Sequence, residues 1–304
     1  SAVAPRLKPT ITAVTTRKAN SVAWGNYDQD VRGTLDLLLG SAELPNVSTV
    51  LHINRDGAFE TREEFTSSGF GPHVVAFGDV TGDGLLDVAV GTPTRVQVYT
   101  NGETRSPAWS LSIPGGVRTL AWGDANDDGK LDLLIGAGDG TVRLYLNEGG
   151  ALATDEAFTT DVGDVRSVAW GDFDGDHYLD FAVGGHDQPV QVFRSIGGAL
   201  QPESAWHFDL SWTAPQTHTT RAVAWADFDS DGDLDLAVGH YGASDVVWEN
   251  AGGTFAPAPA WTAINPYSKT TSLAWGDWDN DGFPDLAAGH DGEPDAVYAN
   301  PWSV

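Results

Sequence analysis

The stretch that decides the fold is Val75-Ala-Phe-Gly-Asp79-Val-Thr-Gly-Asp83-Gly-Leu-Leu-Asp87. An apolar run leads into a short loop with oxygen-bearing side chains at its first, third, fifth and ninth positions, and a second apolar run follows. Four further copies keep this spacing and a looser copy begins the series; they span Leu120–Asp132, Val168–Asp180, Val223–Asp235, Leu273–Asp285 and Val22–Asp36. A phrase that returns about every 50 residues predicts one array of similar units rather than two unrelated domains.

Each unit reads as short apolar strands broken by Gly, Asp and Asn, and no segment has a helical period over three turns. In the fourth unit we expect strands at 165–171, 181–184, 190–193 and 206–210. Four antiparallel strands in a unit of this size are typical of a propeller blade. The sequence therefore predicts an all-β chain, one six-bladed β-propeller domain over residues 1–304 made of four-stranded antiparallel blades, at about 21–67, 73–113, 117–161, 165–210, 221–264 and 271–300.

The two ends of the chain complement each other. The last unit stops after three strands, whereas an unassigned strand pattern lies near the N-terminus. We expect residues 8–14 to add the outer strand of the last blade and so close the ring, which removes an exposed sheet edge. A linear solenoid is the alternative, but a solenoid needs polar caps and the sequence shows none.

Charge and composition exclude several classes of protein. Sixteen basic residues against 43 acidic ones give a formal net charge of −27, which would repel nucleic acid and anionic membrane surfaces. The chain has no cysteine, so disulfides and thiol catalysis are excluded, and no apolar run is long enough to insert in a membrane. The N-terminal residues lack the basic and apolar regions of a signal peptide, so we expect a mature protein, secreted or at the cell surface, from which any signal has been removed.

The phrase Gly276-Asp277-Trp-Asp279-Asn-Asp281-Gly282-Phe-Pro-Asp285 resembles the FG-GAP and VCBS repeats of integrin α-subunit propellers and bacterial surface proteins. The resemblance covers nearly the whole chain. It implies a β-propeller that binds Ca²⁺ between the first and second strands of each blade and serves in adhesion or ligand binding. An ordinary hairpin turn would explain one such loop, but several carboxylates crowded into nine residues repel each other without a cation, and flexible oxygen-rich loops favour calcium over magnesium.

Matching this pattern residue by residue gives the expected metal ligands. The side chains are Asp79, Thr81, Asp83, Asp87; Asp124, Asn126, Asp128, Asp132; Asp172, Asp174, Asp176, Asp180; Asp227, Asp229, Asp231, Asp235; and Asp277, Asp279, Asp281, Asp285. Seventh-position backbone carbonyls are expected to complete each shell, from Leu85, Lys130, Tyr178, Asp233 and Phe283. Glycine at the sixth position permits a sharp turn, and His177 replaces it in the fourth loop. The first loop departs from the pattern through an insertion near Val31-Arg32, with candidate ligands Asn26, Asp28, Asp30 and Asp36.

The opposite face of the ring is the candidate binding surface, because the loops that follow the second strands and those that join the blades open there. Aromatic and histidine side chains on these loops could stack on a sugar ring or anchor a peptide. The candidates are His186, His240, Tyr241, His290, Asp291, Trp212, Tyr267 and His218. Solvated turn residues are the alternative for each of them. The tryptophans of the repeated phrase are more simply core residues between blades.

The function predicted from the sequence is a calcium-binding extracellular recognition module for a protein or carbohydrate ligand, in which calcium is structural. The sequence contains no nucleophile elbow, phosphate-binding loop or HExxH motif, so we do not expect an enzyme. Two alternatives stay open: a propeller lectin with glycan sites opposite the metal loops, and a polysaccharide lyase or hydrolase.

Overall fold

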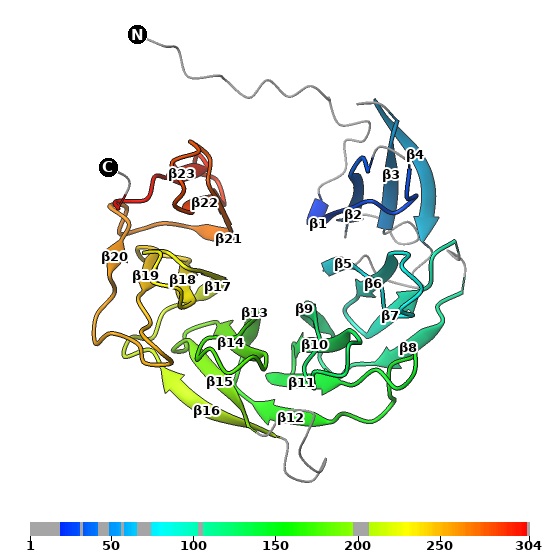
Figure 1. Ribbon diagram of the computed structural model, residues 1–304, viewed down its shortest axis with the longest axis horizontal. Coiled ribbons are helices and arrows are strands. Elements are labelled where there is room, and N and C mark those ends of the chain that lie inside the picture. The colour runs from blue at the N-terminus through cyan, green and yellow to red at the C-terminus, as the bar shows by residue number, and fades with distance from the viewer. Residues whose placement is uncertain are drawn as a thin grey trace.

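The computed structural model describes residues 19–30, 33–41, 49–55, 58–65, 74–102, 106–196 and 207–302. These residues form six small antiparallel sheets arranged as the blades of a propeller around a common axis (Figure 1). The part of the chain that the structure describes contains no helix, and so none that could cross a membrane. The all-β class and the six-bladed propeller predicted from the sequence are confirmed.

The first three blades each contain four strands in chain order from the axis outward. Their bounds are β1 (Ala19–Gly25), β2 (Asp36–Ser41), β3 (Thr49–Arg55) and β4 (Ala58–Phe65); β5 (Val74–Gly78), β6 (Asp87–Gly91), β7 (Arg95–Tyr99) and β8 (Trp109–Ser112); β9 (Val117–Gly123), β10 (Asp132–Ala137), β11 (Thr141–Tyr145) and β12 (Phe158–Asp161).

The fourth and fifth blades also have four strands, and the sixth has three among the described residues. Their bounds are β13 (Val165–Gly171), β14 (Asp180–Gly185), β15 (Gln191–Ile196) and β16 (His207–Thr213); β17 (Thr220–Ala226), β18 (Asp235–His240), β19 (Val246–Trp248) and β20 (Trp261–Thr262); β21 (Thr270–Gly276), β22 (Asp285–His290) and β23 (Ala296–Tyr298). The outer strand that we expect from residues 8–14 lies outside the described residues.

The second strand of a blade is buried along its whole length in β6, β10, β14 and β18. Both faces of these strands are covered by neighbouring blades, which explains their continuous apolar sequences. The buried apolar side chains form five clusters, and each cluster draws its residues from two adjacent blades. The core therefore lies between blades rather than within one, so a blade depends on its neighbours.

Tryptophans of the repeated phrase pack and hydrogen-bond across these interfaces between blades. The indole Nε1 of Trp170 donates to the carbonyl of Ala121 at 3.3 Å, and Trp225 and Trp275 make the same bond to the blade before them at 3.2 Å. A Cβ at Gly123 would lie 2.7 Å from the Trp170 ring, so a glycine at the end of β9 lets this ring pack closely. The predicted role of these tryptophans as inter-blade core is confirmed at these three positions.

The first and sixth blades are the two ends of the series and lie apart in Figure 1. Trp24, which matches these tryptophans in the repeated phrase, is 55% exposed, and a Cβ at Gly276 would meet no atom within 4 Å. Among the described residues, the face of the first blade that would meet the sixth is thus open to solvent.

Candidate functional site

The loops between the first and second strands of blades two to six share two hydrogen bonds: the first aspartate accepts the backbone N–H of the sixth residue, and the fifth-position aspartate accepts that of the seventh. In the sixth blade, Asp277 accepts the backbone N–H of Asp281 at 3.1 Å and of Gly282 at 3.0 Å. Asp281 in turn accepts the N–H of Phe283 at 2.9 Å. These bonds fold the loop around its own carboxylates, so the remaining oxygen lone pairs gather on the inside of the turn.

The backbone of these loops is left-handed at two positions, the fourth and the sixth residue. The fourth has positive φ in Gly82, Asp127, Gly175, Ser230 and Asn280. The sixth residue has positive φ in all five loops, from Gly129 at 80° to Gly232 at 100°, and His177 adopts 76° in the fourth. Glycine reaches this region without steric cost, and histidine enters it more readily than bulkier residues do. The sharp turn predicted from the sequence is confirmed, including its tolerance of His177.

The ninth-position aspartate joins the loop to the blade. Asp235 is fully buried; one oxygen accepts the N–H of Phe228 and the other accepts the N–H of Asn250, both at 2.8 Å. The equivalent aspartate makes the same pair of bonds in the other five blades. Burial raises the pKa of Asp132 and Asp235 to about 6 and that of Asp180 to about 7, against the opposing effect of the backbone hydrogen bonds. A cation nearby would favour the ionised form of these groups.

A set of asparagines after the third strands was missed in the sequence. The side-chain amide of Asn250 donates to the carbonyl of Phe173 in the preceding blade at 2.6 Å, and Asn147 and Asn300 make the same bond at 2.7 Å. Asn101 bonds to Tyr27 in the same way. The signal was present, because an asparagine follows the third strand in most repeats. These bonds fix the acidic loops of successive blades to one another.

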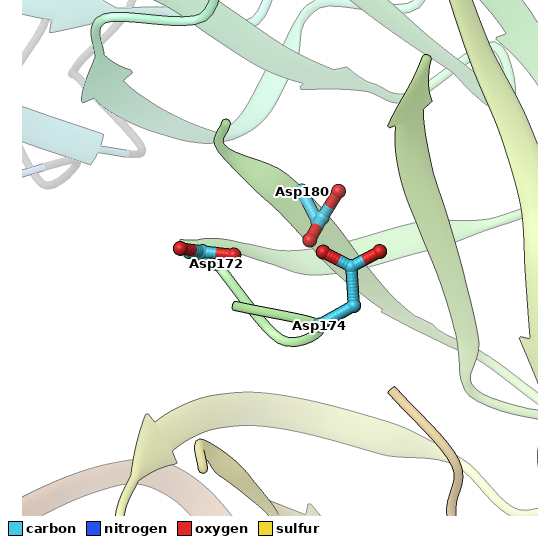
Figure 2. A group of neighbouring side chains, drawn as sticks. All are labelled: Asp172, Asp174 and Asp180. Carbon is cyan, nitrogen blue, oxygen red and sulfur yellow. The ribbon is translucent and has the colours of Figure 1, made fainter. Parts of the chain in front are cut away.

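Three loops bring three carboxylates together. In each of the fourth, fifth and sixth blades, one oxygen from each aspartate at positions one, three and nine lies within 4.8 Å of the others; the groups are Asp172, Asp174, Asp180; Asp227, Asp229, Asp235; and Asp277, Asp279, Asp285. Figure 2 shows the fourth-blade group, with Asp174 and Asp180 facing each other and Asp172 beside them. Such a set of hard oxygen donors fits a divalent cation of the calcium type.

One atom in the fifth-blade group supports this fit directly. Oδ1 of Asp227 is buried and has no hydrogen-bond partner among the described residues. A buried anionic oxygen without a partner costs free energy, whereas a coordinated cation would satisfy it. The residues of this loop therefore fit a metal ion on their own chemistry.

The second and third loops have the same fold with fewer carboxylates. Thr81 and Asn126 stand at the third position. Each of these loops therefore offers aspartates at its first and fifth positions and a neutral oxygen between them. Asp79 accepts the N–H of Gly84 at 2.7 Å and Asp124 accepts that of Gly129 at 2.7 Å, as in the other loops. The lower negative charge should weaken cation binding in these two loops.

The first loop differs. Asp28 forms a salt bridge with Arg55 at 2.8 Å, and Asp30 accepts a hydrogen bond from the Thr34 hydroxyl at 2.6 Å. Residues 31 and 32, where the sequence predicts the insertion, lie outside the described residues. Asp36 keeps its structural bonds to the backbone of Tyr27 and Asn54.

Basic side chains compete for the acids in two of the other loops. Arg194 forms salt bridges with Asp174 and with Asp176, and Lys130 bonds to Asp128 at 2.8 Å. No salt bridge joins a lysine or arginine to the loop aspartates of the second, fifth or sixth blade within the described ranges. The fifth and sixth loops thus combine three clustered carboxylates with no internal counter-charge.

On the opposite face, the predicted ligand-binding residues divide into buried and accessible groups. His240 is 6% exposed, its ring lies 4.9 Å from that of His218, and burial lowers its pKa. The backbone N–H of His240 donates to the buried Asp245, so His240 shapes a turn and offers a ligand little surface. The hydroxyl of Tyr241 donates to Asp291 at 3.0 Å on the exposed side of the same region.

Trp212 requires a correction. The sequence predicts it in a loop between blades, but it lies in β16 and pairs with Val192. Its ring packs against Phe255 at 4.4 Å and Trp248 at 5.2 Å, in the core shared by the fourth and fifth blades. The fourth strand extends further than the sequence pattern indicates because these aromatic contacts continue to its end.

The remaining candidates lie on turns. Tyr267 is 75% exposed and His186 is also exposed. The Nδ1 atom of His290 lies 2.9 Å from the carbonyl oxygen of Pro294, so this ring is tied to its own turn as that of His240 is. The three histidines stand on separate blades, at the ends of β14, β18 and β22 or immediately after them.

The geometry of repeated acidic loops on a propeller agrees with the comparison to known families. The model described as "FG-GAP-like repeat" matches five overlapping segments, at residues 28–90, 79–135, 124–183, 178–238 and 227–288. The chain belongs to the FG-GAP-like repeat family. A propeller of this family supports a module that binds a ligand or another protein, and the fold is typically not enzymatic.

Solved structures share the fold at low identity. The crystal structure of Saccharomyces cerevisiae Sqt1 matches with a TM-score of 0.65 and 12% identity, over 95% of this chain and 74% of that one. A chain of a mitotic checkpoint complex matches at 0.60 and 20% identity, over 90% and 70%. BBS1N, in complex with ARL6DN, matches at 0.62 and 12% identity, over 93% and 79%. None of the curated proteins compared with the chain matches it.

Proposed function

We propose that this FG-GAP-like propeller is a calcium-binding recognition module that works outside the cell and binds a protein or carbohydrate ligand. The observation that carries the proposal is the clustering of three carboxylates in each of the fourth, fifth and sixth loops. The buried Oδ1 of Asp227, which has no partner among the described residues, supports a cation at the fifth loop.

Calcium would be held by the aspartates at the first, third, fifth and ninth loop positions and by the seventh-position carbonyl. It would neutralise the carboxylates and stiffen the loops at one end of the ring. Because the ninth aspartate also accepts the backbone N–H of the asparagine that follows the third strand, and the side chain of this asparagine bonds to the loop of the preceding blade, the stiffening would pass from blade to blade. The ion has a structural part in this proposal, and the ligand binds at the other end.

The test is thermal unfolding with and without a chelator. We expect EGTA to lower the melting temperature by on the order of 10 °C, because an ion bound only to the folded state stabilises it by mass action at each occupied loop. Asp277→Asn, which removes one carboxylate charge from the sixth loop, should reduce the calcium-dependent part of the shift. An equal melting temperature in calcium and in EGTA would contradict the proposal.

The recognition part needs a separate measurement. A glycan array and a capture experiment with extracellular protein fractions, both in calcium, would separate a carbohydrate ligand from a protein ligand. Incubation with acidic polysaccharides, followed by assay for unsaturated products, would reveal a lyase. We expect ligand binding without turnover.

A further inference from the structure

A cavity of about 360 Å³ lies on the axis of the ring. It is lined by one residue from each of five innermost strands: Asn20, Arg118, Arg166, Arg221 and Thr271. Each of these residues is the second of its strand, whereas the metal loop follows the last residue of the same strand. The strands rise about 3.3 Å per residue, so the cavity and the metal loops lie at opposite ends of the region around the ring axis (the channel), on the order of 17 Å apart.

The five lining residues share an unusual backbone feature. Each is the extra residue of a β-bulge: in the third blade, for example, Val117 pairs with Ala137 and Thr119 with Gly136, which leaves Arg118 without a partner in the ladder. The same register shift occurs at the other four positions. A bulge re-aims a side chain, and bulges are common beside binding sites. Here the bulges direct a ring of polar side chains into one cavity.

Charge makes this cavity exceptional in the molecule. The chain has only 16 basic residues and a net charge of −27, yet three arginines from consecutive blades line one space. Arg166 bonds to Asp164, and its Nε is buried without a partner among the described residues. Arg118 has no salt bridge in the described part of the chain. The three arginines carry three positive charges, and Asp164 neutralises one of them, so the cavity has a net positive charge from these groups.

Arg221 links the cavity to the exposed face. Its guanidinium lies 4.3 Å from the centre of the Tyr241 ring, and the Tyr241 hydroxyl bonds to Asp291. Stacking holds the guanidinium in one plane and leaves its N–H groups for an acceptor. A ligand group seated in the cavity would thus continue directly onto the surface where Tyr241 and Asp291 lie.

We propose that this channel cavity binds an oxyanion group, a carboxylate, sulfate or phosphate, carried by the ligand of the module. Guanidinium groups recognise such groups through paired, charge-assisted hydrogen bonds, and the cavity is large enough for a single acidic residue or sugar unit. The inference rests on the proposed recognition role and specifies the chemistry of the ligand.

Isothermal titration of the intact chain with acetate, sulfate and inorganic phosphate tests the inference, in EGTA and again in calcium. We expect at least one of these anions to bind with one site per chain, and the one that binds tightest names the chemical class. Arg118→Ala and Arg221→Ala should each weaken binding about tenfold, because each removes a hydrogen bond to a charged group. Asp164→Asn should tighten binding by freeing Arg166.

Arg55→Ala is the matched control: it changes the charge equally, its side chain lies at the metal-loop end beside Asp28, and it should leave anion binding unchanged. No binding of any of the three anions would overturn the inference, as would binding that Arg118→Ala and Arg221→Ala do not weaken. Melting curves show whether each variant is folded, and Arg118→Gln keeps the polar side chain if alanine is not tolerated. If calcium stabilises the protein and no anion binds, this inference fails while the proposed function stands.

Discussion

The two ends of the channel are built from the same strands but differ in regularity and charge. At one end, five loops repeat the same hydrogen bonds and the same left-handed turn almost residue for residue. At the other, bulges at equivalent positions carry three different side chains, arginine, asparagine and threonine. The residues at the acidic end are nearly the same in each blade, whereas those at the polar end differ from blade to blade. Uniformity of this kind suits a scaffold, and variation suits recognition of an asymmetric ligand.

The largest effect that separates the two ends should be the pH dependence of the metal-free protein. Burial raises the pKa of Asp180 to about 7 and of Asp132 to about 6, against an ordinary value of 3.8. Groups with a raised pKa in the folded state contribute stability at low pH, and that contribution is lost as the pH rises through 6 to 7. In EGTA, the melting temperature should therefore fall between pH 5 and pH 8, because the free energy of unfolding decreases by several kcal/mol in total.

Calcium should reverse this trend, because only ionised carboxylates bind it. Melting curves recorded at each pH in EGTA and in saturating calcium measure both behaviours. A metal-free protein that becomes more stable over the same pH range would show that the hydrogen bonds to these aspartates outweigh their burial.

A smaller effect should follow from removing one of the hydrogen-bonded links between the acidic loops of successive blades. Asn250→Ala removes the side-chain bonds to the carbonyls of Phe173 and Leu234, so we expect a loss of about 3 kcal/mol in the free energy of unfolding. Asn20→Ala, at the opposite end of the channel, is the matched control and should cost less than about 0.5 kcal/mol. Urea denaturation measures both, and equal losses would break the distinction between the ends.

The smallest effect should come from the basic residue in the fourth loop. Arg194 bonds to Asp174 and Asp176, so it competes with a cation for the same oxygens. Arg194→Ala should raise the calcium affinity of that loop about fivefold, since the arginine side chain is 45% exposed and its pairing contributes on the order of 1 kcal/mol. Titration calorimetry against Lys269→Ala, an exposed charge on the other face, provides the comparison. An unchanged affinity would mean that the loop does not bind calcium through these acids.

The sequence predicted the repeated parts of this structure well. Apolar runs around the acidic phrase located the first and second strands, and glycine spacing located the left-handed turns, because both depend on local residues alone. The position of Trp212 was wrong because its contacts come from the next blade, at Trp248 and Phe255. A strand end that is stabilised by contacts with a neighbouring blade shows no alternating apolar pattern in its own sequence.

Two functional features were missed although the residues were visible. The asparagines after the third strands recur, but their bonds to the preceding blade span 67 to 77 residues and are seen only in three dimensions. Arg118 and Arg166 each follow the valine that begins the innermost strand of its blade. Regular alternation would not place them in the channel; the bulge does, and a bulge has no clear sequence signal here.

The central claim is that the clustered aspartates are calcium sites. Elemental analysis of the purified protein, dialysed against buffer with a defined, millimolar free calcium concentration, tests it most directly. The account predicts at least two calcium ions per chain, held by the fifth- and sixth-blade loops, in which three carboxylates cluster without a basic partner in the described residues. It also predicts the loss of one ion in Asp227→Asn. A wild-type protein that retains less than one calcium ion per chain at millimolar free calcium would contradict the account.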